Sequence, residues 1–138
     1  MFVGCNASMP GPGGAAKTMA DTTVHGQAGL LSLDKIKLPP GFKIELYSDK
    51  LANARSMDLS PSGVLFVGTR DAGNVYAVKD ENGDFKTDKT WTIASGLKMP
   101  NGVALKDGDL YVAEVHRILK YPAIESNLDK PKKEVFVD

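Results

Sequence analysis

The stretch "MPNGVALKDGDLYVAEVHRILKYP" covers residues 99–122 and repeats a pattern found earlier in the chain. The earlier copy, "ARSMDLSPSGVLFVGTRDAGNVYAV", covers residues 54–78. With one residue omitted near Pro61 the apolar positions coincide, and Leu65 corresponds to Leu110, a step of 45 residues. Repeats of this length are typical of β-propeller blades, each of which has four strands.

Each repeat contains four short segments rich in β-branched and aromatic residues and separated by Gly, Pro, Asn or Asp, which is the pattern of strands and turns. The predicted strands are 56–60, 64–69, 74–79 and 91–95 in the first repeat, and 102–106, 109–114, 117–121 and 133–137 in the second. The stretches "SPSG", "KDGD" and "ENGD" are predicted to be the hairpin turns.

The predicted fold class is therefore all-β, a β-propeller fragment of about two four-stranded blades. An alternating segment, "GFKIELYS" at 41–48, is predicted to be an N-terminal strand of the kind that closes a propeller ring. A propeller needs at least four blades, so we expect further blades from a longer chain or from several chains. The competing interpretation is a two-sheet β-sandwich.

Composition excludes several classes of protein. The 138 residues include 17 Lys plus Arg and 17 Asp plus Glu, so no basic surface is predicted that would bind nucleic acid. The single cysteine, Cys5, can form neither an internal disulfide nor a site with several thiolates. No apolar run reaches the roughly 18 residues that span a bilayer.

Residues 1–33 differ in composition from the rest and are predicted to be a flexible leader that precedes the propeller part, 34–138. The stretch "FVGC" has the small residue before cysteine that a bacterial lipoprotein cleavage site requires. A lipid anchor at Cys5 is thus one interpretation, and an ordinary cysteine in a disordered tail is the other. His25 lies in the same tail and has no visible partner.

Three motifs, "NARSM", "FVGTR" and "MPNGVA" followed by "LYVAE", make residues 33–125 resemble the opening of the bacterial sorbosone dehydrogenase family. These enzymes are quinoprotein sugar dehydrogenases that use pyrroloquinoline quinone (PQQ). The resemblance implies a six-bladed propeller, PQQ in the central opening, usually with calcium, a sugar or aldehyde substrate, an electron acceptor, and a periplasmic or membrane-anchored location.

The resemblance also implies a histidine base that takes the hydroxyl proton while hydride passes to the quinone. That histidine is expected in a "HHGW"-type stretch beyond the second blade, which this sequence does not contain. We therefore expect the chain to be inactive by itself. His116 follows a strand, but a loop histidine without a carboxylate partner is more often structural.

Candidate ligand-binding residues collect at strand ends. In an antiparallel blade the start of the first strand and the end of the second lie at one rim. This places Arg55, Arg70, Asn101, Glu114 and His116 together, at the mouth where propellers bind ligands. Arg55 and Arg70 would pair with the carboxylates of PQQ, Asn101 would bind the quinone or substrate edge, and Glu114 is a further cofactor-binding candidate. The alternative is that all are solvated loop residues.

The opposite rim is predicted to hold a calcium loop, "DENGDFKTD" at 80–88. Its candidate ligands, Asp80, Asn82, Asp84 and Asp88, follow the 1, 3, 5, 9 spacing of such loops. Phe85 occupies the usual glycine position and no bidentate glutamate follows, so an ordinary hairpin with solvated acids remains the alternative.

Two other functions stay open. A calcium-dependent, lactonase-like propeller hydrolase requires acidic ligands around the channel mouth, where only Glu114 qualifies. A propeller that serves as an interaction scaffold requires no site histidine and no cofactor. No zinc pattern, phosphate loop or nucleophile triad is recognisable.

Overall fold

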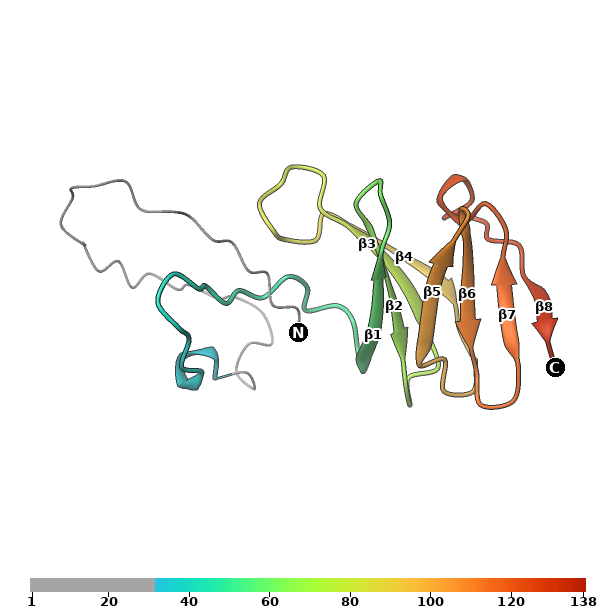
Figure 1. The fold of residues 1–138 in the computed structure, drawn as a ribbon, viewed down its shortest axis with the longest axis horizontal. Coiled ribbons are helices and arrows are strands. Elements are labelled where there is room, and N and C mark those ends of the chain that lie inside the picture. Colours follow the sequence, from blue (N-terminus) through green and yellow to red (C-terminus); the bar gives the residue numbers. More distant parts are fainter. Residues whose placement is uncertain (1–31) are drawn as a thin grey trace. The chain divides into compact units, whose positions relative to one another are not determined.

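The computed structural model describes residues 32–138 and shows an all-β protein with almost no helix. The described residues fall into two units, residues 32–49 and residues 50–138. The described strands all belong to the second unit and form two four-stranded antiparallel sheets (Figure 1).

Each sheet is a meander in which every strand pairs with the next one along the chain. The first sheet contains β1 (Ala54–Leu59), β2 (Val64–Thr69), β3 (Val75–Lys79) and β4 (Lys89–Ala94). The second contains β5 (Gly102–Lys106), β6 (Asp109–Ala113), β7 (Ile118–Tyr121) and β8 (Glu134–Val137). All eight strands predicted within the repeats are confirmed, with ends that differ by no more than two residues.

The sequence repeat is also a repeat of strand register. Leu59 pairs with Leu65 in the first sheet, and Leu105 pairs with Leu110 at the equivalent place in the second. The hairpin between the paired strands turns at Gly63 in one sheet and at Gly108 in the other, with φ of 84° and 83°. Glycine adopts this left-handed conformation without the clash that a Cβ would cause.

The largest apolar cluster forms a layer between the two sheets, and Val67 and Val78, on the other face of the first sheet, are completely buried as well. Phe66 on β2 and Leu110 on β6 are completely buried in this layer. The other buried members are Val64, Val75, Ala77, Ile93 and Leu97 from the first sheet and its following loop, and Val112, Leu119, Tyr121 and Ile124 from the second sheet and the turn after it. Full burial of one such large side chain contributes about 1.5–3 kcal/mol, so this layer is the main force that joins the sheets.

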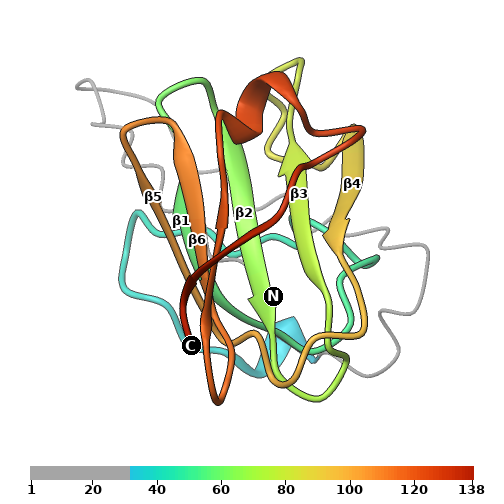
Figure 2. The same ribbon diagram turned by 90° about the vertical axis from the view of Figure 1, so that its right-hand side faces the viewer.

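The first strand of the second sheet lies against the first two strands of the other. β5 contacts β1 and β2, and Figure 2 looks onto the second sheet with the first behind it. Asp58 on β1 accepts a hydrogen bond from the Leu105 N–H at 2.6 Å. A Cβ on Gly68 of β2 would lie 2.6 Å from the Pro100 carbonyl oxygen, so the two backbones approach closely at this point.

Each sheet also has an outer face, which points away from the shared layer. Directly paired residues share a face and neighbours along a strand alternate, so the register assigns the side chains. The outer face of the first sheet consists of Met57, Leu59, Leu65, Val67, Tyr76, Val78, Thr90 and Thr92, and none of these is charged. The outer face of the second sheet includes Gly102, Ala104, Lys106, Asp109, Tyr111, Ala113, Ile118, Lys120, Glu134 and Phe136.

The strand predicted at 41–48 does not form. In the first unit, which contains this segment, a short 3-10 helix, η2 (Leu33–Lys35), is followed by a turn in which the Phe42 N–H donates to the Pro39 carbonyl at 3.2 Å. An alternating segment becomes a strand only by pairing with an edge, and none of the eight strands pairs with it. Only residues 32 and 33 of the predicted leader are described, and Cys5 and His25 lie outside the described residues.

Candidate functional site

The candidate site begins at the end of the first sheet where β1 starts and β2 stops. Ala54 pairs with Thr69, and Arg55 and Arg70 each follow one member of this pair on the two adjacent antiparallel strands. The β1 ladder is irregular between Ala54 and Met57, and Arg55 lies within that irregular part. Both arginine side chains are exposed.

The corresponding end of the second sheet carries Asn101, Glu114 and His116. Gly102 pairs with Ala113, so Asn101 precedes β5 where Glu114 follows β6. Two backbone hydrogen bonds join the segment between the sheets to the ends of both sheets, one to each. The Leu97 N–H donates to the Gly73 carbonyl at 3.0 Å, and the Val115 N–H donates to the Lys98 carbonyl at 3.2 Å.

These contacts put all five candidate residues on one rim of the two sheets, as strand direction predicted. We call this end, with Arg55, Arg70, Asn101, Glu114 and His116, the arginine rim. The side chains of Arg55, Arg70, Asn101 and His116 make no hydrogen bond or ion pair with any of residues 32–138. Both guanidinium groups are thus without a partner among the described residues and offer free hydrogen-bond donors at the rim.

Glu114 differs from the other four residues because its carboxylate is already used. Its side chain is 1% exposed, Oε1 accepts from the Lys98 N–H at 2.6 Å, and Oε2 accepts from the Arg117 Nε at 2.5 Å. Burial by itself raises the pKa of Glu114, but the bonds from Lys98 and Arg117 outweigh it and hold the pKa below its ordinary value. Glu114 thus fastens the loop before β5 to the hairpin after β6.

Arg117 was not singled out from the sequence, although its spacing offered a signal. It lies three residues after Glu114, across the turn that joins β6 to β7, and the Glu114 N–H donates to the Arg117 carbonyl at 2.9 Å. An acid and an arginine that flank a tight hairpin turn can meet side by side. The β6–β7 turn is therefore held by a backbone hydrogen bond and by an ion pair between the same two residues.

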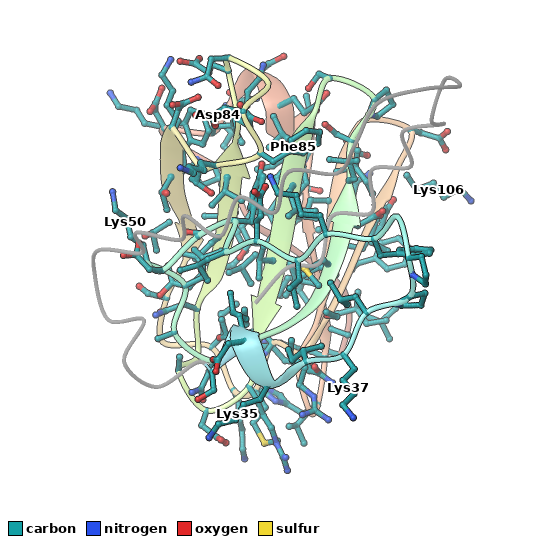
Figure 3. The ribbon with its side chains drawn as sticks, turned by 90° about the vertical axis from the view of Figure 1, so that its left-hand side faces the viewer. Lys35, Lys37, Lys50, Asp84, Phe85 and Lys106 are labelled. Carbon is teal, nitrogen blue, oxygen red and sulfur yellow. The ribbon has the colours of Figure 1, made fainter. Side chains whose placement is uncertain are left out.

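The predicted calcium loop lies at the opposite rim, beside the Ser60–Gly63 turn. β3 ends at Lys79, which pairs with Val64 at the start of β2. Asp80 Oδ1 accepts from the Gly83 N–H at 2.7 Å and Asp80 Oδ2 accepts from the Phe85 N–H at 2.8 Å. The loop is thus wrapped around the Asp80 carboxylate; Figure 3 labels Asp84 and Phe85 within it.

The remaining candidate ligands of this loop also bind its backbone. Asn82 Oδ1 accepts from the Asp84 N–H at 2.8 Å, Asp84 Oδ1 accepts from the Lys86 N–H at 2.9 Å, and Asp88 Oδ2 accepts from the Glu81 N–H at 2.7 Å. Slight desolvation raises the pKa of Asp80, but its bonds from backbone N–H groups prevail and lower that pKa. Within residues 32–138 no three His, Cys, Asp or Glu side chains gather closely enough to hold a metal ion.

Phe85 has φ of 63°, so it adopts the left-handed conformation at the position where calcium loops usually have glycine. The backbone at Phe85 therefore has the left-handed conformation that is usual at this position of a calcium loop, although the residue is not glycine. Its oxygen atoms still have lone pairs free, because each carboxylate oxygen can accept more than one bond.

Two buried hydroxyl groups were missed by the sequence analysis. Within the described part of the chain, the Ser56 Oγ and the Tyr121 hydroxyl are buried and have no hydrogen-bond partner. Burial raises the pKa of Tyr121 to about 12. In the sequence both residues look like ordinary strand positions. Their burial was not predictable, because it depends on how the sheets pack and not on the local sequence.

The described part of the chain is thus an all-β protein of two successive four-stranded antiparallel sheets, with two arginines at one end that have no partner within residues 32–138. No protein-family model, curated protein or solved structure matches the chain. None of the helices in residues 32–138 is long and apolar enough to cross a membrane.

Proposed function

We propose that the chain is the N-terminal part of a β-propeller of the PQQ-dependent sugar dehydrogenase type, and that its arginine rim binds the carboxylates of the cofactor. The observation that carries the proposal is that Arg55 and Arg70, at the ends of adjacent strands, have no partner among residues 32–138. They belong to the motifs "NARSM" and "FVGTR", on which the resemblance to that family rests.

The strand order supports a propeller. Each sheet is built from four consecutive strands, and the sheets meet at their first strands, β1 and β5. Blades of a propeller have this order, whereas a β-sandwich of the Greek-key type exchanges strands between its sheets. The proposed parent ring has six such blades.

The residues of the rim fit the proposed cofactor in part. A guanidinium group matches a carboxylate with two parallel hydrogen bonds, so Arg55 and Arg70 would each hold one carboxylate, and Asn101 would donate to a quinone or substrate oxygen. Glu114 does not fit, because both of its oxygens are engaged and its side chain is buried. When bound, PQQ supplies the acceptor for a hydride from a sugar or aldehyde substrate, and an external acceptor then takes the electrons.

The same finding weakens the hydrolase alternative. A calcium-dependent hydrolase needs carboxylates directed at an ion in the channel mouth, and Glu114 was the acid predicted for that role. Its ion pair with Arg117 uses the charge that a calcium ion would require. Export to the periplasm, by resemblance, and a lipid anchor at Cys5, by the "FVGC" stretch, remain part of the dehydrogenase proposal.

The test is binding of PQQ to the purified chain, measured by quenching of protein fluorescence. Loss of one charged bidentate partner costs about 1.5–3 kcal/mol, so Arg55→Ala and Arg70→Ala should each weaken binding about 10-fold to 150-fold. Lys130→Ala, in an exposed loop away from the rim, is the matched control. Absence of PQQ binding, or binding that neither arginine variant weakens, would contradict the proposal. Turnover is not the readout, because the sequence contains no "HHGW"-type stretch with the expected base.

A further inference from the structure

The turn that carries Arg70 is closed by a buried side chain instead of by the strand ladder. Regular pairing of β2 with β3 ends at Gly68 and Val75, so Thr69 and Asn74 face each other across the next position. Thr69 Oγ1 accepts a hydrogen bond from the Asn74 N–H at 2.9 Å and donates to the Asn74 carbonyl at 2.7 Å. One hydroxyl thus satisfies both backbone groups of Asn74 at the base of the turn.

Thr69 holds this turn from its buried side, and Arg70 leaves it on the exposed side. Thr69 is completely buried, whereas Arg70 is exposed. The Gly73 N–H donates to the Arg70 carbonyl at 3.4 Å, so the backbone of Arg70 is fixed at both ends of the turn. A long side chain on a fixed backbone loses less freedom when it binds a ligand. Thr69 therefore limits the positions that the Arg70 guanidinium can reach.

The second repeat uses the equivalent position for the same task. The 45-residue step of the repeat relates Thr69 to Glu114. Glu114 also closes the turn that follows it with its side chain, through the bond from the Arg117 Nε. The same position thus fixes the rim in both sheets, with a hydroxyl in the first and a carboxylate in the second.

The Arg70 turn is also joined to the segment that leads to Asn101. The Leu97 N–H donates to the Gly73 carbonyl at 3.0 Å. A Cβ on Gly73 would lie 2.7 Å from the Leu97 carbonyl oxygen, so the two backbones are in direct contact. Arg70 and Asn101 therefore start from backbone segments that are held against each other, which defines where a ligand can bind both.

We propose that Thr69 is a positioning residue of the arginine rim, which holds the 70–73 turn in the conformation from which Arg70 binds a carboxylate of the cofactor. Thr69 acts through Arg70 and not by contact with the ligand, because it is completely buried. The identity of the ligand rests on the proposed function, whereas the restraint on Arg70 depends only on hydrogen bonds within the chain.

The test compares two substitutions of Thr69. Thr69→Val nearly keeps the shape of the side chain but removes the hydroxyl, and Thr69→Ser keeps the hydroxyl. PQQ binding is measured by quenching of protein fluorescence, and circular dichroism checks the fold. We expect Thr69→Val to weaken binding about 2-fold to 12-fold, since a side chain that must become ordered on binding loses about that much affinity. Thr69→Ser should bind PQQ as the wild type does.

A double variant separates positioning from a general loss of structure. If Thr69 acts through Arg70, Thr69→Val should have no further effect on PQQ binding once Arg70→Ala has removed the guanidinium. In the Arg55→Ala background the effect of Thr69→Val should persist. Equal weakening in the Arg70→Ala background would mean that Thr69 supports the whole rim, and this overturns the inference. An affinity that Thr69→Val leaves unchanged also overturns it.

A measurement without PQQ separates this inference from the proposed function. Backbone ¹⁵N order parameters of residues 70–74 should be about 0.85 in the wild type and in Thr69→Ser, and should fall toward about 0.6 in Thr69→Val. A turn that stays ordered in Thr69→Val overturns the inference. A turn that loosens in a chain that does not bind PQQ contradicts the proposed function alone.

The wild-type chain provides a further check if Thr69→Val does not fold. The Asn74 N–H, bound by Thr69, should exchange its hydrogen with solvent much more slowly than an unfolded peptide does. A protected Asn74 amide supports the inference, and an unprotected one overturns it.

Discussion

Glu114 shows how a single side chain acquires a role that its position along the chain does not disclose. It stands at a strand end among exposed rim residues, but its side chain is 1% exposed and both oxygens accept hydrogen bonds. Loss of the Glu114 carboxylate would leave the Lys98 N–H and the Arg117 side chain without their acceptor, and an unsatisfied buried polar group lowers the free energy of unfolding. Glu114 is therefore a residue that stabilises the rim rather than a free ligand.

We predict that Glu114→Gln lowers the free energy of unfolding by about 2 kcal/mol, because hydrogen bonds to a charged group contribute about 1.5–3 kcal/mol. Urea denaturation measures the loss, and Glu134→Gln, in the exposed strand β8, is the matched control. If Glu114→Gln loses no more stability than the control, the hydrogen bonds of Glu114 do not contribute to the free energy of unfolding.

The same variant has a defined pH dependence. The folded-state pKa of Glu114 lies below its ordinary value, so its stabilisation is complete above the unfolded pKa and disappears as the pH falls through the folded pKa. The difference in stability between wild type and Glu114→Gln should thus be largest near neutral pH and shrink in acid, below about pH 4. A difference that is constant with pH would contradict the assignment.

At the scale of elements, the strands of the repeats were predictable because each carries its own periodicity and is bounded by its own turn residues. The segment 41–48 has the same alternation but forms no strand. Alternating apolar and polar residues mark a segment that can form a strand. The strand forms only where the edge strand of a sheet is available for pairing. The loop at 80–88 is an intermediate case, since its hydrogen bonds are local but the calcium ion predicted for it would come from outside the chain.

For this loop we predict that calcium raises the unfolding temperature of the chain and that magnesium does so much less, because the larger ion suits a flexible ring of oxygens. Calcium at about 100 times its Kd would add about 2.7 kcal/mol. Asp80→Asn and Asp84→Asn should remove the effect, whereas Glu81→Gln, outside the ligand spacing, should keep it. If calcium leaves the unfolding temperature unchanged, the loop is an ordinary connection.

At the scale of the whole molecule, the decisive feature is how closely the two sheets approach at β1, β2 and β5. Gly68 has no side chain at the point where the Pro100 and Asn101 carbonyl oxygens would lie 2.6 and 2.8 Å from a Cβ. The hydrogen bond from Leu105 to Asp58 spans the same junction. The spacing of the sheets, and with it the position of the arginine rim, depends on this contact.

We predict that Gly68→Ala destabilises the chain by about 1–3 kcal/mol, the usual cost of overpacking a core. Gly68 does not have a positive φ, so the change tests the approach of the sheets and not backbone strain. Gly102→Ala is the milder comparison, since its Cβ would lie 3.1 Å from the Ala113 Cβ. Thermal unfolding that is the same for Gly68→Ala and wild type would mean that the sheets separate easily.

The candidate site was predictable in position but not in detail. Strand direction alone placed Arg55, Arg70 and Asn101 on one rim, because antiparallel pairing dictates which strand ends coincide. It could not distinguish the free arginines from the engaged Glu114. That distinction arises from Lys98 and Arg117, which the loop between the sheets and the β6–β7 turn bring to Glu114.

The sequence by itself determined the all-β class, the eight strands of the two repeats and the rim on which the candidate residues lie, because these follow from local periodicity, turn chemistry and antiparallel pairing. Only the tertiary structure decided which side chains are buried, which acid is paired, and whether 41–48 is a strand. Those properties depend on contacts between segments far apart in sequence. Their free energies come from desolvation and packing, which no local pattern contains.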